Sequence, residues 1–220
     1  IIHLFEEFGL GLFSHLRGMY AFALWDSSSG QLILAVDHVG MKPLYLHERD
    51  GKLFFASEAK ALFADPSMLR RLNLAALDAY LSFGYPLDAA SLFEGIQRLP
   101  PGHFYVVEPG KAPSSQAFWE YPPPNRDGRT QQEGVIINEA RDLLADAIRI
   151  HLRSDVPPGL LLGDGIESAA LLALAARESG SGIKTFSAGY DSEGDLTDTR
   201  RLAGHFQSDH HERVIFAADW

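Results

Sequence analysis

The second half of the chain alternates between segments of helical length and short apolar runs that end in glycine or polar residues. The expected helices are residues 131–153, 166–179 and 198–206, and the expected strands are residues 159–162, 183–187 and 210–216. Strands joined by such helices are expected to lie parallel, because the chain crosses back over the sheet before the next strand begins. The pattern therefore predicts a parallel α/β sheet.

The first half has a different pattern, in which apolar and aromatic runs are separated by short turns. Antiparallel strands are expected at residues 19–26, 31–37 and 52–58, with one more inside residues 99–110. Tyr20, Phe22 and Trp25, all in the first of these runs, are expected to pack in the core. Asp26, Asp37 and Glu58 lie near strand ends, where acidic residues usually accept hydrogen bonds from turns and helix starts. We expect that role for them, and no acid–base catalysis.

An amphipathic helix is expected in the sequence LAALDAYLSFG. Asn73 before it is a favoured N-cap residue, and Gly84 is a favoured C-terminal stop. Apolar residues recur inside it at helical spacing and share one face: Leu74, Leu77, Tyr80 and Leu81.

A proline-rich stretch separates the two halves. Residues 121–130 read YPPPNRDGRT, a composition typical of an exposed and semi-rigid connector. The chain of 220 residues is long enough for two cores. We therefore expect one domain over residues 1–120, a linker over 121–130 and a second domain over 131–220.

Composition limits the partners and the compartment of the protein. The net charge of −10 opposes binding to nucleic acid, and no apolar run approaches the roughly 20 residues that cross a bilayer. The chain has no cysteine, which excludes a cysteine nucleophile within these residues and fits a reducing compartment. We expect a cytoplasmic protein. The opening sequence IIHLFEEFGLGLF is typical of the middle of a helix, so we also expect residues before it.

The stretch Leu162–Ser168 joins an expected strand to an expected helix and contains Gly-Asp-Gly. In parallel sheets, ligands bind beyond the carboxyl ends of the strands, where loop N–H groups and a helix N-terminus attract anions. The stretch lacks the Lys-Ser/Thr ending of a Walker loop, and Ser168 stands where GxGxxG requires its third glycine. It is therefore a candidate anion cradle of another type.

Several motifs occur in the order found in one family: LRGMYAFALWD, DHVGMKPLY, FASEAKAL, LPPGHFY, SDVPPG, TFSAGYD and DHHE. Together they resemble the glutamine-hydrolysing asparagine synthetases, across nearly the whole chain. The resemblance implies part of an Ntn-hydrolase-type αββα glutaminase sandwich, followed by the start of a Rossmann-like parallel α/β ATP-pyrophosphatase domain. It also implies transfer of the amide nitrogen of glutamine to aspartate through an aspartyl-adenylate, with ATP and Mg²⁺. The oligomeric state is left open.

The candidate cradle departs from the family pattern Ser-Gly-Gly-x-Asp-Ser. Matched residue by residue, the family's first serine is Gly163, its first glycine is Asp164 and its aspartate is Glu167, while Gly165 and Ser168 are kept. A lost hydroxyl donor to a charged oxygen costs roughly 1.5–3 kcal/mol. A carboxylate about 4 Å from a phosphate charge costs roughly 1 kcal/mol in water and about 4 at an intermediate dielectric. We therefore expect weakened nucleotide binding.

The resemblance implies a nucleotide site over two segments. These are the altered pyrophosphate loop (Leu162, Gly163, Asp164, Gly165, Ile166, Glu167 and Ser168) and an adenosine edge (Ser187, Ala188 and Gly189). No catalytic residue and no metal ligand is expected within the chain. His210 and His211 are neighbours on an expected strand, so they point to opposite faces and cannot easily share one ion.

Three functions remain open from the sequence. The first is an asparagine synthetase-like protein, with these 220 residues inactive alone. The second is an amidotransferase relative that acts on another carboxylate. The third is a non-catalytic scaffold or regulatory homologue, which the altered loop favours.

Overall fold

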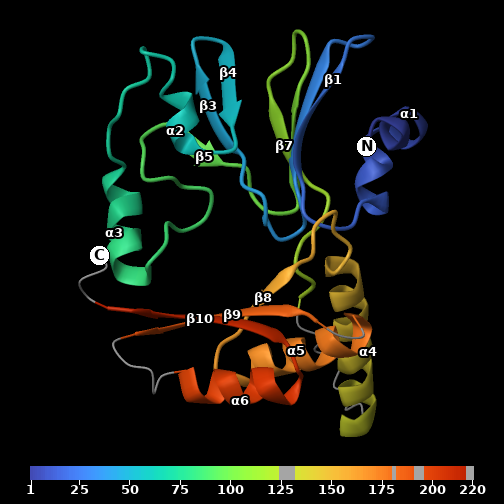
Figure 1. Cartoon of the computed structure of the whole chain (residues 1–220). Coiled ribbons are helices and arrows are strands. Elements are labelled where there is room, and N and C mark those ends of the chain that lie inside the picture. The colour runs from blue at the N-terminus through green and yellow to red at the C-terminus, as the bar shows by residue number, and fades with distance from the viewer. Residues whose placement is uncertain (124–131, 180–181, 191–195, 217–220) are drawn as a thin grey trace. The chain divides into compact units, whose positions relative to one another are not determined.

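The computed structural model describes residues 1–123, 132–179, 182–190 and 196–216, and it divides the chain into two compact units, Ile1–Pro124 and Asn125–Trp220. Figure 1 shows the elements of each unit. Most of the expected connector, from residue 124 onward, lies outside the described residues. No helix among the described residues is both long enough and apolar enough to span a bilayer.

The first unit contains two antiparallel sheets. One sheet has the order β1-β2-β6-β7, from Ala21–Asp26, Gln31–Val36, His103–Val107 and Ser114–Ala117. The other has the order β4-β3-β5, from Lys52–Ala56, Tyr45–Arg49 and Ile96–Arg98. The helix α1 (Ile2–Phe8) and the 3₁₀ helix η1 (Gly9–His15) lie beside the first sheet, and α2 (Ala59–Leu62) lies beside the second (Figure 1). The helix α3 (Leu74–Phe83) lies apart from the strands of both sheets (Figure 1).

The strand β2 shows why the layers stack in this order. Its residues alternate between two cores, because successive side chains of a strand point to opposite faces. Ile33 packs with Leu12 and Phe13 of η1, whereas Leu34 packs with Leu46 of β3. A strand buried on both faces requires a layer on each side, as in the predicted αββα arrangement.

One expectation about apolar side chains is wrong, and the apolar face of one helix is exposed. Trp25 is 62% exposed, because it alternates with Phe22 and Leu24 on β1 and faces outward. The helix α3 begins at the Asn73 cap and ends at Gly84 as predicted, but its apolar face is largely exposed. Leu74 and Leu81 are 72% and 75% exposed, and only Ala76 of this helix is buried.

The second unit is a parallel sheet with the order β10-β9-β8, as the alternation predicts. Its elements are α4 (Glu133–His151), β8 (Gly159–Leu161), α5 (Ile166–Ser179), β9 (Lys184–Tyr190), α6 (Thr197–His205) and β10 (Asp209–Ile215). The helices α5 and α6 lie on one face of the sheet (Figure 1). The residues of β9 alternate strictly between exposed and buried, which fits a sheet covered on one face. Leu172 of α5 is fully buried in the core between them.

Candidate functional site

The loop Leu162–Ser168 lies where β8 ends and α5 begins. The N–H of Leu162 donates to the carbonyl of Phe186 at 2.8 Å, and the carbonyl of Leu162 accepts from the hydroxyl of Ser187 at 2.7 Å. These two bonds fix the start of the loop to β9. Because α5 begins at Ile166, its first N–H groups have no acceptor within the helix and form its positive end. The loop therefore presents donors at the carboxyl edge of a parallel sheet.

Ser168 closes the loop from the helix side. The N–H of Gly163 donates to the Oγ of Ser168 at 3.1 Å. As an acceptor in this bond, the hydroxyl keeps its own hydrogen for a further acceptor, such as a phosphate oxygen. A Cβ on Gly163 would lie 3.4 Å from the same Oγ, an ordinary contact, so a serine at position 163 fits without displacement.

Two carboxylates border the loop. Asp164 and Glu167 are both exposed. A Cβ on Gly165 would lie 2.8 Å from Oε2 of Glu167, so this carboxylate packs over the Cα of Gly165. Neither loop glycine has a left-handed φ, and Asp164 does not have one either. Asp164 therefore carries no backbone penalty for standing at a glycine position of the family, and its effect on an anion is through its charge.

Ser187, Ala188 and Gly189 lie inside β9, which extends past the expected end of the strand. Leu161 is the last residue of β8 paired with β9, opposite Phe186, so the following residues of β9 border the loop on that side. Ser187 and Gly189 face the helices and Ala188 faces the opposite way. A Cβ on Gly189 would lie 2.9 Å from Cγ of the buried Leu196, so packing requires glycine here. The three residues therefore do not present their side chains on one face, and they share only a continuous stretch of strand backbone.

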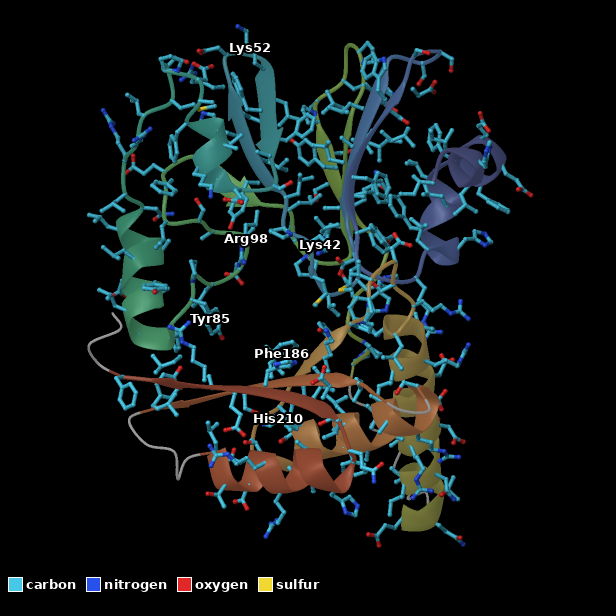
Figure 2. The ribbon with its side chains drawn as sticks, viewed as in Figure 1. Lys42, Lys52, Tyr85, Arg98, Phe186 and His210 are labelled. Atoms are coloured by element: carbon cyan, nitrogen blue, oxygen red, sulfur yellow. The ribbon has the colours of Figure 1, made fainter. Side chains whose placement is uncertain are left out.

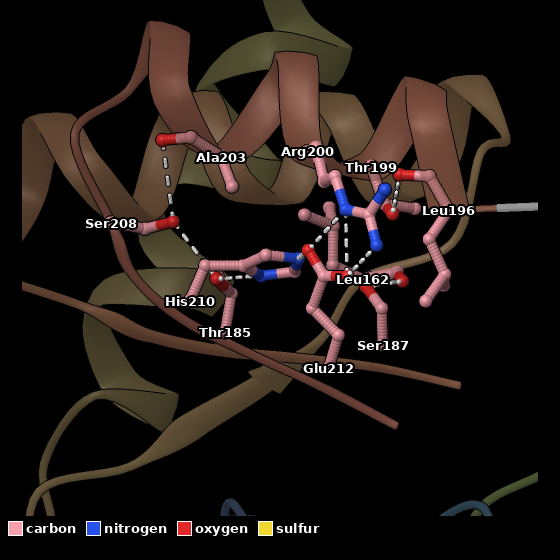
Figure 3. Close-up of polar contacts among 10 residues, drawn as sticks. All are labelled: Leu162, Thr185, Ser187, Leu196, Thr199, Arg200, Ala203, Ser208, His210 and Glu212. Atoms are coloured by element: carbon pink, nitrogen blue, oxygen red, sulfur yellow. Dashed lines mark hydrogen bonds and ion pairs between the residues drawn. The ribbon is translucent and has the colours of Figure 1, made fainter. Parts of the chain in front are cut away.

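A polar network on the helix-covered face of the sheet was not expected from the sequence (Figure 3). The hydroxyl of Thr185, fully buried, bonds to the hydroxyl of Ser208 at 2.8 Å and to Nδ1 of His210 at 2.9 Å. Nε2 of His210 lies 3.5 Å from Oε1 of Glu212. The other carboxylate oxygen of Glu212, Oε2, pairs with Arg200 of α6 at 2.6 Å. The network ties α6 to β9 and β10. The alternation of Thr185 with Ser187 on a strand was the only signal for it.

Arg200 controls the charge of this network. Hydrogen bonds from its guanidinium lower the pKa of Glu212, and they outweigh partial burial, which raises it.

His210 and His211 point to opposite faces as predicted: Figure 2 shows His210 on the helix side, and His211 stacks on Phe186 with ring centroids 5.2 Å apart. No cluster of three metal-ligating side chains occurs in the part of the chain that the structure describes.

Two of the carboxylates near strand ends in the first unit stabilise turns. Asp37 is 1% exposed, and its carboxylate accepts four backbone N–H groups, those of Tyr20, Val39, Met41 and Lys42, at 3.0–3.2 Å. Burial raises the pKa of Asp37, but the four amides outweigh burial and lower it. Hydroxyl donors from two serines lower the pKa of Asp26 to about 2. Glu58 precedes α2 without a side-chain capping bond and pairs instead with Lys60, so the expected helix-start role is wrong for its side chain.

Comparison with known proteins agrees with this architecture. Residues 1–119 match the glutamine amidotransferase domain, and residues 139–220 match asparagine synthase. The chain belongs to the glutamine-hydrolysing asparagine synthetase family. Asparagine synthetase 1 of Bacillus subtilis is 32% identical to it over 181 residues, which cover 82% of this chain and 28% of that protein. Asparagine synthetase 2 of the same organism is 34% identical over 187 residues, 81% of this chain and 25% of that protein.

Another similar protein of the family has a different name. The amidase chry2 of Gibberella zeae is 31% identical over 188 residues, covering 84% of this chain and 27% of that protein. The chain thus spans about a quarter of the length of these curated relatives.

Proposed function

We propose that residues 131–220 are the N-terminal part of an ATP-pyrophosphatase-type synthetase domain whose pyrophosphate loop has lost most of its affinity. The observation that carries this proposal is the position of Leu162–Ser168, at the end of β8 and the start of α5, where the first helix N–H groups have no acceptor within the helix. Position and backbone favour an anion. The carboxylates of Asp164 and Glu167 oppose one at the same place.

The nucleotide in this proposal is ATP with Mg²⁺, bound by the loop through its phosphates and by the backbone of Ser187, Ala188 and Gly189 at the adenosine. Ser168 would donate its hydroxyl to a phosphate oxygen. Glu167 keeps the charge of the family's aspartate but is one methylene longer. Its carboxylate packs over Gly165, and an aspartate side chain at this position would hold its carboxylate closer to the helix backbone. A cation held by that side chain would shift with it.

By this proposal, residues 1–120 are the C-terminal part of a glutaminase domain, and the connector at 121–130 joins them to the synthetase domain. The whole reaction would be ATP-dependent transfer of nitrogen from glutamine to aspartate. No residue of this chain is a cysteine, so none of its side chains can supply a thiolate nucleophile. These 220 residues alone are therefore proposed to be inactive, with substrates of small-molecule type.

Calorimetric titration of MgATP into the chain tests the proposal. We expect no tight binding to the native loop. The variant Gly163→Ser/Asp164→Gly/Glu167→Asp restores the family pattern and is sterically allowed at position 163. It should bind MgATP measurably more tightly. Tight, Mg²⁺-dependent binding to the native chain would contradict the proposed loss of affinity.

A second candidate function is a non-catalytic scaffold, which the acidic loop favours. The two candidates separate in the full-length protein carrying the restored loop. Recovery of ATP–pyrophosphate exchange would support a weakened enzyme, and the absence of exchange would support the scaffold. A third possibility is transfer to a carboxylate other than aspartate; one similar protein carries the name amidase and not asparagine synthetase. ATP–pyrophosphate exchange that requires a carboxylate other than aspartate, in the protein with the restored loop, would identify this third function.

A further inference from the structure

A pocket of about 180 Å³ lies in the first unit, between the segment that follows β2 and the strand β5. Lys42 lines it from the first of these segments and Arg98 from the end of β5; Figure 2 labels both side chains. Neither cation forms an ion pair within the described residues. In a chain with 29 acidic and 19 basic residues, two uncompensated cations at one pocket call for an explanation.

The backbone around the pocket is fixed by contacts that do not involve these charges. The amide of Lys42 donates to the buried carboxylate of Asp37, and the amide of Arg98 donates to the carbonyl of Ala89 at 2.7 Å. The guanidinium of Arg98 uses one nitrogen to donate to the carbonyl of Asp88 at 3.2 Å. Its other N–H groups remain for a ligand, in the fork geometry that suits the two oxygens of a phosphate or carboxylate.

Size and charge limit the ligand. A volume of 180 Å³ corresponds to roughly six water molecules at about 30 Å³ each. That is room for a group of a few heavy atoms and is too small for a nucleotide. Asp88 also lines the pocket, so the local charge is two cations against one carboxylate. The balance still favours an anion.

We propose that this pocket binds a small oxyanion, held by the ammonium of Lys42 and the guanidinium of Arg98. The ligand is either a free phosphate or a carboxylate, which share the recognised pair of oxygens. The site is on the first unit and does not depend on the nucleotide loop proposed for the second.

Amide chemical shifts of the ¹⁵N-labelled chain test the proposal, with Gly40 and Ala89, both at the pocket, as reporters. Sodium phosphate and sodium acetate are titrated separately against sodium chloride of equal ionic strength. We expect saturable shifts at both reporters with phosphate, with acetate or with both, and the stronger of the two identifies the source of the oxyanion. Because the reporters lie on the first unit, failure of nucleotide binding at Leu162–Ser168 would leave this result unchanged.

Four variants decide which groups bind. Lys42→Gln removes an exposed cation whose side chain forms no ion pair with any other described residue, and it should weaken binding about tenfold, the effect of one charge-assisted hydrogen bond. Arg98→Lys keeps the charge and removes the fork, and it should also weaken binding. Asp88→Asn should tighten it, and asparagine tolerates the left-handed φ of 52° at that position as well as aspartate does. Lys52→Gln, an exposed lysine of β4 away from the pocket, is the matched control (Figure 2).

The proposal is overturned if neither anion shifts Gly40 and Ala89 beyond the chloride reference. It is equally overturned if Lys42→Gln and Lys52→Gln weaken binding to the same extent, because the effect would then be general screening. An unchanged amide shift at the buried Ile33 in each variant shows that the first unit is still folded.

Discussion

The charges at the loop predict a specific gain of affinity when they are removed. A phosphate oxygen that accepts from the N–H of Gly165 lies about 3 Å from that nitrogen. The carboxylate of Glu167 packs over Gly165, and a carboxylate about 4 Å from a phosphate charge repels it by about 1 kcal/mol in water. The side chains of Asp164 and Glu167 are both exposed, so the repulsion has the magnitude expected at the dielectric constant of water. Each neutralisation then tightens binding about fivefold, and Asp164→Asn/Glu167→Gln about 30-fold.

The assay is calorimetric titration of pyrophosphate into the chain at about 0.1 M salt, where the screening length is about 10 Å. The control is Glu178→Gln at the far end of α5, which makes the same type of charge change. It lies eleven residues from Glu167 along the helix, or about 16 Å, beyond the screening length. The reasoning is refuted if the double variant binds no more tightly than the native chain. It is also refuted if Glu178→Gln gives an equal gain per charge removed.

Three further substitutions test contacts that stabilise the two units. Gly189→Ala should lower the Tm, because the added Cβ would lie 2.9 Å from Cγ of Leu196, and overpacking of this kind costs about 1–3 kcal/mol; an unchanged Tm would show that Leu196 moves freely. Asp37→Asn should cost about 1–3 kcal/mol in urea unfolding, since an amide nitrogen then faces backbone N–H groups; a neutral result would argue against the four bonds. Glu212 has a lowered folded pKa, so its pair with Arg200 stabilises above the unfolded value near 4.5 and is lost as pH falls through the folded value. Glu212→Gln should therefore flatten the dependence of Tm on pH below about 4.5, and a dependence identical to that of the native chain would contradict this.

Much of the second unit follows from its sequence, because helix length and strand length alternate there with clear stops. The helix α5 begins and ends at the residues expected from Leu162–Ser168 and the apolar run that follows. In the first unit β5 and β7 were not expected. The strand β7, Ser114–Ala117, is polar and exposed throughout, so it carries no alternating hydrophobic signal and is positioned by pairing with β6.

Exposure was harder to predict than secondary structure. The face of α3 is apolar at helical spacing, yet Leu74 and Leu81 are exposed, because periodicity reports a face and not whether anything covers it. The prediction that Trp25 packs in the core was wrong for a related reason. On a strand with one covered face, every second side chain points outward whatever its type.

The candidate site was partly accessible from sequence. The position of the loop follows from a strand, two glycines and a helix in succession. The bonds from the N–H of Gly163 to Ser168 and from the hydroxyl of Ser187 to Leu162 do not follow, because they depend on hydroxyl positions set by the fold. The roles of the loop residues and of Ser187, Ala188 and Gly189 in nucleotide binding stay predictions.

The central claim is that Leu162–Ser168 has the geometry of a nucleotide cradle and that its own carboxylates keep it empty. The amide resonances of Gly163 and Gly165 measure this directly during a pyrophosphate titration. In Asp164→Asn/Glu167→Gln both resonances should shift saturably, and in the native chain they should shift weakly at the same concentrations. Strong shifts in the native chain, or none in the neutralised variant, would contradict the claim.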